Sequence, residues 1–224
     1  MPAKKKIDAI SVNTEQERPV KASKKAQTAS GANEIENAVP DGTKIKESSE
    51  RIPEPQTRVF NYNGMDFVIL DETGDGMGVI AISADILENR MRFADNNDYG
   101  SNDWRKSTIR KKLNTEYIKK FNQNDLLPIL SDLTADTGED NFGMCEDYIA
   151  LPSDSMIRKF NKVIPSYNTW IWTITPWAID YSNMSAVGAR TQAKTIYSEQ
   201  PNRELGVAIV CIFKKEVIDV WVTT

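Results

Sequence analysis

Apolar and polar residues alternate along residues 59–70, V-F-N-Y-N-G-M-D-F-V-I-L, a spacing typical of β-strands. Asn63-Gly64, in the middle of this stretch, is a dipeptide that two-residue hairpin turns favour. The stretch therefore predicts a β-hairpin. Other apolar runs predict strands at residues 79–83, at 148–151, from Trp170 onward, at 207–213 in a central position, and at 217–222 as a hairpin partner or an edge strand.

A helical spacing appears after Trp104, where Ile109, Leu113 and Tyr117 recur every four residues. The basic residues between them mostly lie on other faces, which indicates a helix that packs on a sheet through its apolar side. Asn114 is expected to end this helix, and Thr115 to cap the next turn. Helical pieces are predicted at residues 85–91 (capped by Ser83 or Asp85), 104–113, 115–121, 124–133, and from a Ser153 cap to Phe160. Hairpins mixed with short helices favour an α+β class.

The first 58 residues differ in composition from the rest. They are rich in Lys, Glu, Ser, Thr, Ala, Asn and Pro, and they contain no aromatic residue. Such a segment buries too little apolar surface to offset the entropy of ordering, so we expect a disordered polar tail over 1–58 and a folded domain over 59–224. The tail starts basic. It is either a solubilising linker or an arm that docks on an acidic surface such as nucleic acid, or on a larger assembly such as a virion or copies of the chain itself.

Charge and residue types exclude several classes of function. The chain has a net charge of −4, and the tail is slightly basic, so the domain is acidic and we do not expect it to bind nucleic acid. No apolar run is long enough for a membrane-spanning helix, and the basic N-terminus lacks the apolar core of a secretory signal, so we expect a product made in the cytoplasm.

The chain has no histidine and two cysteines, Cys145 and Cys211. This composition excludes histidine-dependent triads and histidine-containing zinc sites, and two cysteines alone cannot build a four-thiolate zinc site. We expect both cysteines to be reduced core residues, with a disulfide as the alternative. No P-loop or G-x-G-x-x-G motif is present, and we expect neither a cofactor nor enzymatic activity.

The pattern W-x-x-S-x-I-R-x-x-L-N starts at Trp104 and ends at Asn114. It resembles the signature of an uncharacterised domain family common in gut bacterial and phage genomes, and the likeness extends over about residues 59–220. The other segments that carry it are 78–83, 148–160, 172–176, Gly188 and 206–209. This chain departs from the family at Ile174 and at Ala208-Ile209, where the family has arginine and arginine-proline. Any role of those arginines is absent here.

That family is similar to the C-type-lectin-like fold of formylglycine-generating enzymes and of the variable proteins of diversity-generating retroelements. The resemblance implies a twisted antiparallel sheet with flanking short helices and a long irregular region that presents ligand-binding residues. It also implies an association with phages or prophages.

Residues 165–200 are the predicted recognition surface, because aromatic rings there alternate with polar groups that suit a protein or carbohydrate ligand. The opposing interpretation is that alternate tryptophans on a strand place at least one ring in the core. The candidate ligand-binding residues are Tyr167, Trp170, Trp172, Trp177, Asp180, Tyr181, Asn183, Arg190, Gln192 and Tyr197.

Residues 95–103 read D-N-N-D-Y-G-S-N-D and are a candidate calcium site, because they are rich in Asp and Asn side chains. An EF-hand is excluded because Lys106 stands where the loop needs a bidentate glutamate. A lectin-like calcium site built from Asp95, Asn97, Asp98 or Asp103 is an alternative to the favoured interpretation, a turn that caps the following helix.

We therefore expect a non-catalytic binding or structural module that displays a lectin-like recognition domain on a virion or other assembly. One alternative is a ligand-binding protein diversified by a retroelement in its C-terminal third. The other alternative is an enzyme of the formylglycine-generating type. The cysteines are evidence against it, because neither has a histidine base and they lie far apart in the sequence.

Overall fold

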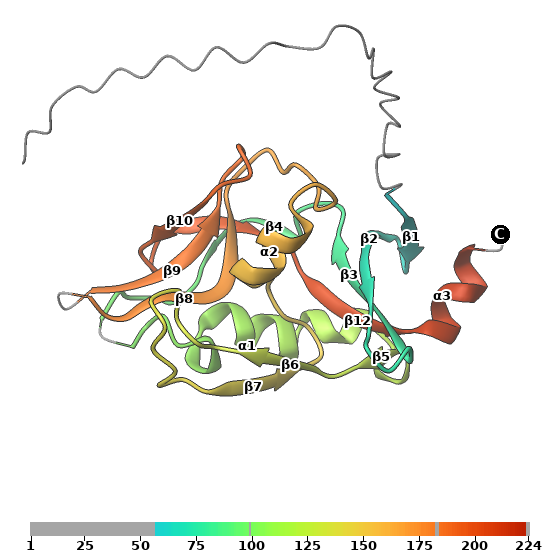
Figure 1. Cartoon of the computed structure of the whole chain (residues 1–224), viewed down its shortest axis with the longest axis horizontal. Helices are drawn as coiled ribbons and strands as arrows, with labels where there is room; N and C mark the ends of the chain where they lie inside the picture. Colours follow the sequence, from blue (N-terminus) through green and yellow to red (C-terminus); the bar gives the residue numbers. More distant parts are fainter. Residues whose placement is uncertain (1–56, 99, 182–183, 223–224) are drawn as a thin grey trace, which may run out of the picture. The chain divides into compact units, whose positions relative to one another are not determined.

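The computed structural model describes residues 57–98, 100–181 and 184–222, which form an α+β fold of mostly antiparallel sheets with a few short helices, as predicted (Figure 1). The predicted tail lies outside the described residues except for Thr57 and Arg58. No helix in the described ranges is long and apolar enough to cross a bilayer.

One sheet has the strand order β1-β2-β3-β12-β5. The predicted hairpin is confirmed, since β1 and β2 pair around Asn63 and Gly64, whose φ angles of 50° and 82° suit a two-residue turn. The apolar run ending at Phe213 does take the predicted central position, between β3 and β5. The strands are β1 (Val59–Tyr62), β2 (Met65–Glu72), β3 (Gly78–Ser83), β12 (Val210–Lys214) and β5 (Leu126–Leu127).

A second sheet has the order β10-β9-β8-β11-β4 and contains most of the predicted recognition region. Only β11 and β8 pair in parallel, through Gly206 and Ile171. The strands are β4 (Glu88–Arg92), β8 (Ile171–Tyr181), β9 (Met184–Arg190), β10 (Ile196–Glu199) and β11 (Glu204–Val207).

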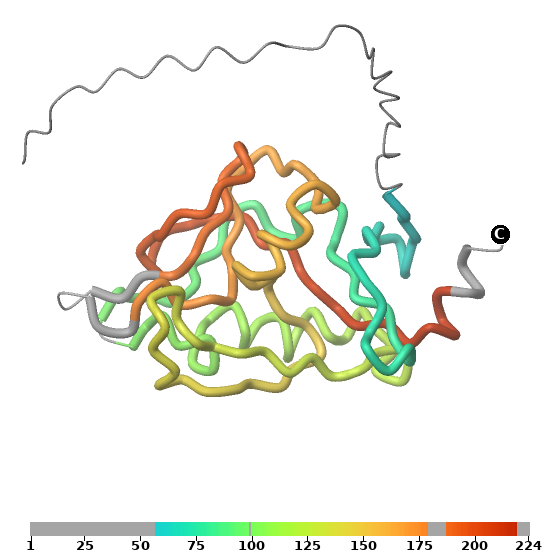
Figure 2. Tube along the Cα trace, viewed as in Figure 1, coloured from blue at the N-terminus to red at the C-terminus, as the bar shows by residue number. Residues whose placement is uncertain are grey.

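A two-stranded ribbon of β6 (Ile129–Asp132) and β7 (Met144–Asp147) completes the strands of the described residues. Figure 2 shows this yellow ribbon running along the green segment that contains the longest central helix. The helices are η1 (Trp104–Lys106), α1 (Thr108–Thr115), η2 (Tyr117–Lys120), η3 (Gln123–Asp125), α2 (Asp154–Phe160) and α3 (Lys215–Val222).

The main hydrophobic core joins both sheets to α1. Ile109 and Leu113 are fully buried in it, together with Trp104, Trp172 and Phe213. The predicted apolar face of the helix is therefore confirmed. A second core of aliphatic residues lies between α2 and the sheets, around Ile157 and Ile171.

The break between η1 and α1 falls at Ser107, whose Oγ accepts a hydrogen bond from the Arg110 N–H at 3.1 Å. The prediction that Asn114 ends the helix and Thr115 caps the next turn was wrong. α1 continues through Thr115, whose hydroxyl donates back to the Lys111 carbonyl at 2.7 Å. The predicted cap at Ser153 is confirmed, since its Oγ accepts from the Met156 N–H at 3.1 Å.

The predicted helix at 85–91 was wrong, because β4 occupies most of this segment. Ser83 cannot cap a helix there, since its Oγ accepts the N–H of Ile209 at 3.1 Å. The Leu87 N–H is likewise taken by the Val207 carbonyl at 2.7 Å.

The predicted helix at 124–133 was also wrong. Pro128 removes a backbone donor in the middle of the segment, and the chain forms η3, β5 and β6 instead. Residues 148–151 do not form a strand, since only Ala150 makes an isolated bridge, to Val210.

Residues 217–222 belong to α3 and not to a strand. The helix buries Ile218 in the main core and contacts β1, β3 and β12. The many β-branched residues in this segment suggested a strand, and packing overrode that preference.

Candidate functional site

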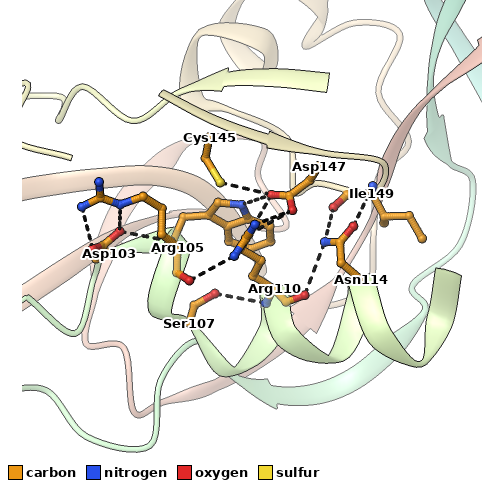
Figure 3. A network of polar contacts seen from close by, with 9 residues as sticks. Asp103, Arg105, Ser107, Arg110, Asn114, Cys145, Asp147 and Ile149 are labelled. Carbon is orange, nitrogen blue, oxygen red and sulfur yellow. Dashed lines mark hydrogen bonds and ion pairs between the residues drawn. The ribbon is translucent and has the colours of Figure 1, made fainter. Parts of the chain in front are cut away.

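The motif that begins at Trp104 is a buried structural network around Asp147 (Figure 3). The Asp147 carboxylate accepts hydrogen bonds from Trp104 Nε1 at 2.8 Å and from Arg110 Nε at 2.9 Å. The Cys145 thiol donates to the same carboxylate at 3.4 Å. These polar groups bind one another across α1 and β7, so this network supports the fold and does not present a ligand site.

The thiols do not form a nucleophilic site. Cys145 and Cys211 are both free and buried, as predicted. Burial raises the pKa of each thiol, and for Cys145 the Asp147 carboxylate raises it further. Both sulfurs are therefore protonated at neutral pH.

In the 95–103 loop, Asp103 serves the start of the following helix. The Asp103 carboxylate is fully buried and bonds the Arg105 guanidinium at 2.9 Å, and it caps η1. The favoured interpretation of a helix-capping turn is confirmed. Within the described residues, no group of three or more Cys, Asp or Glu side chains is placed to hold a metal ion.

Trp172 does not belong to an exposed recognition face. Its side chain is fully buried, packs on Phe93 and donates through Nε1 to the Met91 carbonyl at 2.7 Å. It ties β8 to β4 across the sheet. Residues 171–176 are all buried, so both faces of β8 are covered here and Trp172 has no exposed side.

Tyr167 and Arg190 are also buried, which corrects the expectation that they are exposed. Arg190 Nη1 donates to the Pro165 carbonyl at 3.0 Å, and its guanidinium lies 5.8 Å from the centre of the Tyr167 ring. The Tyr167 hydroxyl donates to the Ser83 carbonyl at 2.7 Å. Exposed Gln192 donates through its side chain to the Asn168 carbonyl. The three side chains hold the 164–168 segment in place.

Trp170 and Tyr197 are the predicted residues that reach the surface together. Trp170 is half-buried and Tyr197 is 56% exposed. Their rings are nearly parallel, with centroids 6.2 Å apart and an interplanar angle of 19°. This pair forms an aromatic surface on one edge of the second sheet.

Of the remaining candidates, Trp177 is the one whose side chain the structure describes. Trp177 lies further along β8, where its carbonyl accepts from the Thr137 N–H at 3.3 Å. The side chains of Asp180 and Tyr181, and all of Asn183, lie outside the described residues.

Trp170 lines an open hollow of about 800 Å³, which we call the arginine–aromatic groove. Segments from β4, from the residues before β8 and from the β10–β11 connection form its walls. It is lined by Asn89, Arg90, Arg92, Thr169, Trp170, Glu199, Asn202, Arg203, Glu204 and Leu205. A protein surface hollow of this size can seat a small ligand or part of a chain.

Gly206 allows these segments to approach. Its N–H donates to the Trp170 carbonyl at 2.8 Å. A Cβ at this position would lie 2.7 Å from Thr169 Cγ2 and 3.2 Å from Ile86 Cγ2. Glycine is therefore needed where β11 passes between the two walls.

The groove carries an excess of positive charge. Arg92 faces Glu204 and Arg203 faces Glu199, each with an N–O distance of 3.7 Å between exposed or half-exposed side chains. Such pairs contribute little free energy in water. Arg90 is exposed and has no ionic or hydrogen-bond partner among the described residues. The Arg90 guanidinium is therefore available to bind an anion, although the domain as a whole is acidic.

Sequence reasoning missed the arginines of this groove. Arg90 lies in the segment predicted to be helical, Arg92 directly follows that segment, and Arg203 lies in a turn. No local pattern groups them, because they meet only when β4 pairs with β11.

Comparison with known proteins gives no relative: no family model, no curated protein and no solved structure matches this chain.

Proposed function

We propose that this chain is a non-catalytic recognition module whose ligand binds in the arginine–aromatic groove. The observation that carries the proposal is an open hollow that Trp170 and the unpaired Arg90 line together, with the exposed Tyr197 ring stacked on Trp170. Exposed aromatic rings and arginines are enriched where proteins bind partners.

The walls of the groove are held in place before any ligand arrives. Arg190, Tyr167 and Gln192 brace one wall, and Trp172 anchors the other through the Met91 carbonyl. A preorganised site loses less conformational entropy on binding. The buried thiols lack a base, which supports binding without catalysis.

The proposal also includes the type of domain and the assembly that displays it. The family resemblance supports a C-type-lectin-like domain of phage or prophage origin, displayed on a virion or another assembly through residues 1–58. The antiparallel sheets, the short helices and the irregular 164–170 wall are compatible with such a domain. Fold alone does not define function, so the proposal depends on the groove.

Binding to immobilised panels of glycans and extended peptides tests the recognition function. We expect the full chain to bind at least one probe, and the variant Tyr197→Ser to lose that binding, because the exposed half of the ring pair is removed. Lys119→Gln, which changes an exposed residue of η2 outside the groove, is the control. Binding unchanged in Tyr197→Ser and in Arg90→Gln, or no bound probe, would contradict the proposal.

Co-purification with phage particles tests the display function. We expect the full chain to be recovered with particles, and a chain without residues 1–58 to remain in the unbound fraction. Equal recovery of both forms would show that the tail does not dock the domain.

A further inference from the structure

A second hollow extends the arginine–aromatic groove. It has a volume of about 380 Å³ and shares Asn89 with the groove. Both are bounded by the same two segments: residues 84–92 line one side and residues 166–170 the other. The two hollows therefore adjoin at Asn89, and we call them the polar end and the arginine end of the candidate site.

The polar end has side chains that can hydrogen-bond to the hydroxyl groups of a ligand. Asp85, Asn89, Ser166 and Asn168 line it, and no arginine or lysine does. The side chains of Asp85, Asn89 and Asn168 have no hydrogen-bond partner among the described residues. A carboxylate accepts hydrogen bonds, and amides both donate and accept, so together they match a ligand rich in hydroxyl groups.

The arginine end has a different chemistry. Three guanidinium groups face two carboxylates there, so it has room for one further negative charge. Guanidinium forks bind planar anions in a bidentate way. Trp170 also lines this end, and aromatic rings attract the polarised C–H groups of a sugar ring.

From these two ends we propose that the ligand is an acidic oligosaccharide of at least two sugar units. The acidic sugar lies on Trp170 with its anionic group at Arg90, and a neighbouring sugar places its hydroxyls at Asp85, Asn89 and Asn168. This inference rests on the proposed recognition function and names the ligand class for the same site.

Calorimetric titration of the full chain tests the charge requirement with matched probes. The probes are tetragalacturonate, its fully methyl-esterified form, a heparin-derived tetrasaccharide and a tetraglutamate peptide. We expect an acidic tetrasaccharide to bind at least about 10-fold more tightly than the methyl ester, because esterification removes the charge and keeps the hydroxyls. Binding of tetragalacturonate identifies the anionic group of the ligand as a carboxylate. Binding of the heparin-derived tetrasaccharide without binding of tetragalacturonate identifies it as a sulfate.

Single substitutions test which part of the ligand each end of the site binds. Arg90→Gln should weaken the acidic tetrasaccharide about 10-fold and leave the ester unchanged, while Lys119→Gln changes neither. Asn168→Ala should weaken the tetrasaccharide and leave monomeric galacturonate unchanged, because a single sugar occupies only the arginine end.

The outcomes separate this inference from the proposed function. If the ester and the acid bind equally, or if tetraglutamate binds best, the ligand is not an acidic oligosaccharide. The groove is still a recognition site if Tyr197→Ser abolishes that binding. If no oligosaccharide binds while another probe on the panels requires Tyr197, the ligand class is wrong and the function stands. If neither Tyr197→Ser nor Arg90→Gln affects the binding of any probe, both fail.

Discussion

The side-chain amide of Asn114 binds both backbone groups of Ile149. Its Nδ2 donates to the Ile149 carbonyl at 2.9 Å, and its Oδ1 accepts the Ile149 N–H at 3.2 Å (Figure 3). The amide thus acts as a one-residue strand partner between α1 and the chain after β7. Ile149 is fully buried, so water cannot take over these bonds.

Replacement of Asn114 by alanine should destabilise the fold. The buried N–H and C=O of Ile149 would lose their partners, and the expected loss is about 3 kcal/mol of unfolding free energy, measured by urea denaturation. Asn124→Ala, which removes an exposed amide, should change stability by less than about 0.5 kcal/mol. Equal effects of the two variants would show that the Asn114 bonds add no stability.

The Arg110–Asp147 pair should show energetic coupling. Arg110 Nη2 lies 2.9 Å from Asp147 Oδ1, and the Asp147 side chain is 3% exposed. Asp147→Asn should cost about 2 kcal/mol, because it leaves a partly buried guanidinium without its counter-charge. In a double-mutant cycle with Arg110→Gln, we expect a coupling energy of about 1 kcal/mol or more. Additive effects would indicate that Asp147 acts mainly through Trp104.

Local chemistry explains what could be predicted from the sequence. The Asn63-Gly64 turn, the apolar face of α1 and the Ser153 cap each depend on residues within a few positions of one another. These features form through interactions between neighbouring residues and do not depend on distant parts of the fold. Sequence patterns therefore predict them.

Distant partners explain what could not be predicted. Ser83 failed to cap a helix because its hydroxyl binds Ile209, which is 126 positions away. Asp147, the centre of the Trp104 network, is 43 positions from that tryptophan. Arg190 was expected at the surface because it lies in a stretch where aromatic and polar residues alternate, but its bonds to carbonyls of the 164–165 segment hold it inside.

The same limit applies to the groove. Trp170 and Tyr197 were identified because aromatic residues cluster in one stretch of sequence. Arg90 and Arg203 come from separate segments, and only the pairing of β4 with β11 brings those segments together.

The two cysteines should resist modification in the folded protein. Burial raises the pKa of both thiols, and neither Cys145 nor Cys211 is exposed. We expect reaction with a disulfide reagent at pH 8 to be at least about 100-fold slower than in denaturant, where both thiols react. A fast first thiol in the native state would reveal an accessible cysteine and would reopen the question of a reactive site.

Asp154 is a buried acid at the first turn of α2. Its side chain packs against Gly188, where a Cβ would lie 2.6 Å from the Asp154 Oδ1. The nearby Thr173 hydroxyl donates to the Gly188 carbonyl at 2.9 Å, and neither carboxyl oxygen of Asp154 has a hydrogen-bond partner among the described residues. Burial raises the pKa of Asp154 from 3.8 to about 6, while the Thr173 hydroxyl and Arg158 lower it and Asp136 raises it by smaller amounts.

This acid should make the fold more stable as the pH falls from about 6 to about 4. A raised pKa means that the folded state binds the proton more tightly than the unfolded state, so the penalty of the buried carboxylate grows above pH 4 and is complete above pH 6. A difference of about two pKa units corresponds to roughly 3 kcal/mol. Asp154→Asn, which is neutral at every pH, should raise the unfolding free energy at pH 7 and remove this part of the pH dependence. Urea denaturation at pH 4, 5, 6 and 7 measures both, with the exposed Asp140→Asn as the control. A wild-type pH profile that Asp154→Asn leaves unchanged would show that Asp154 titrates alike in both states.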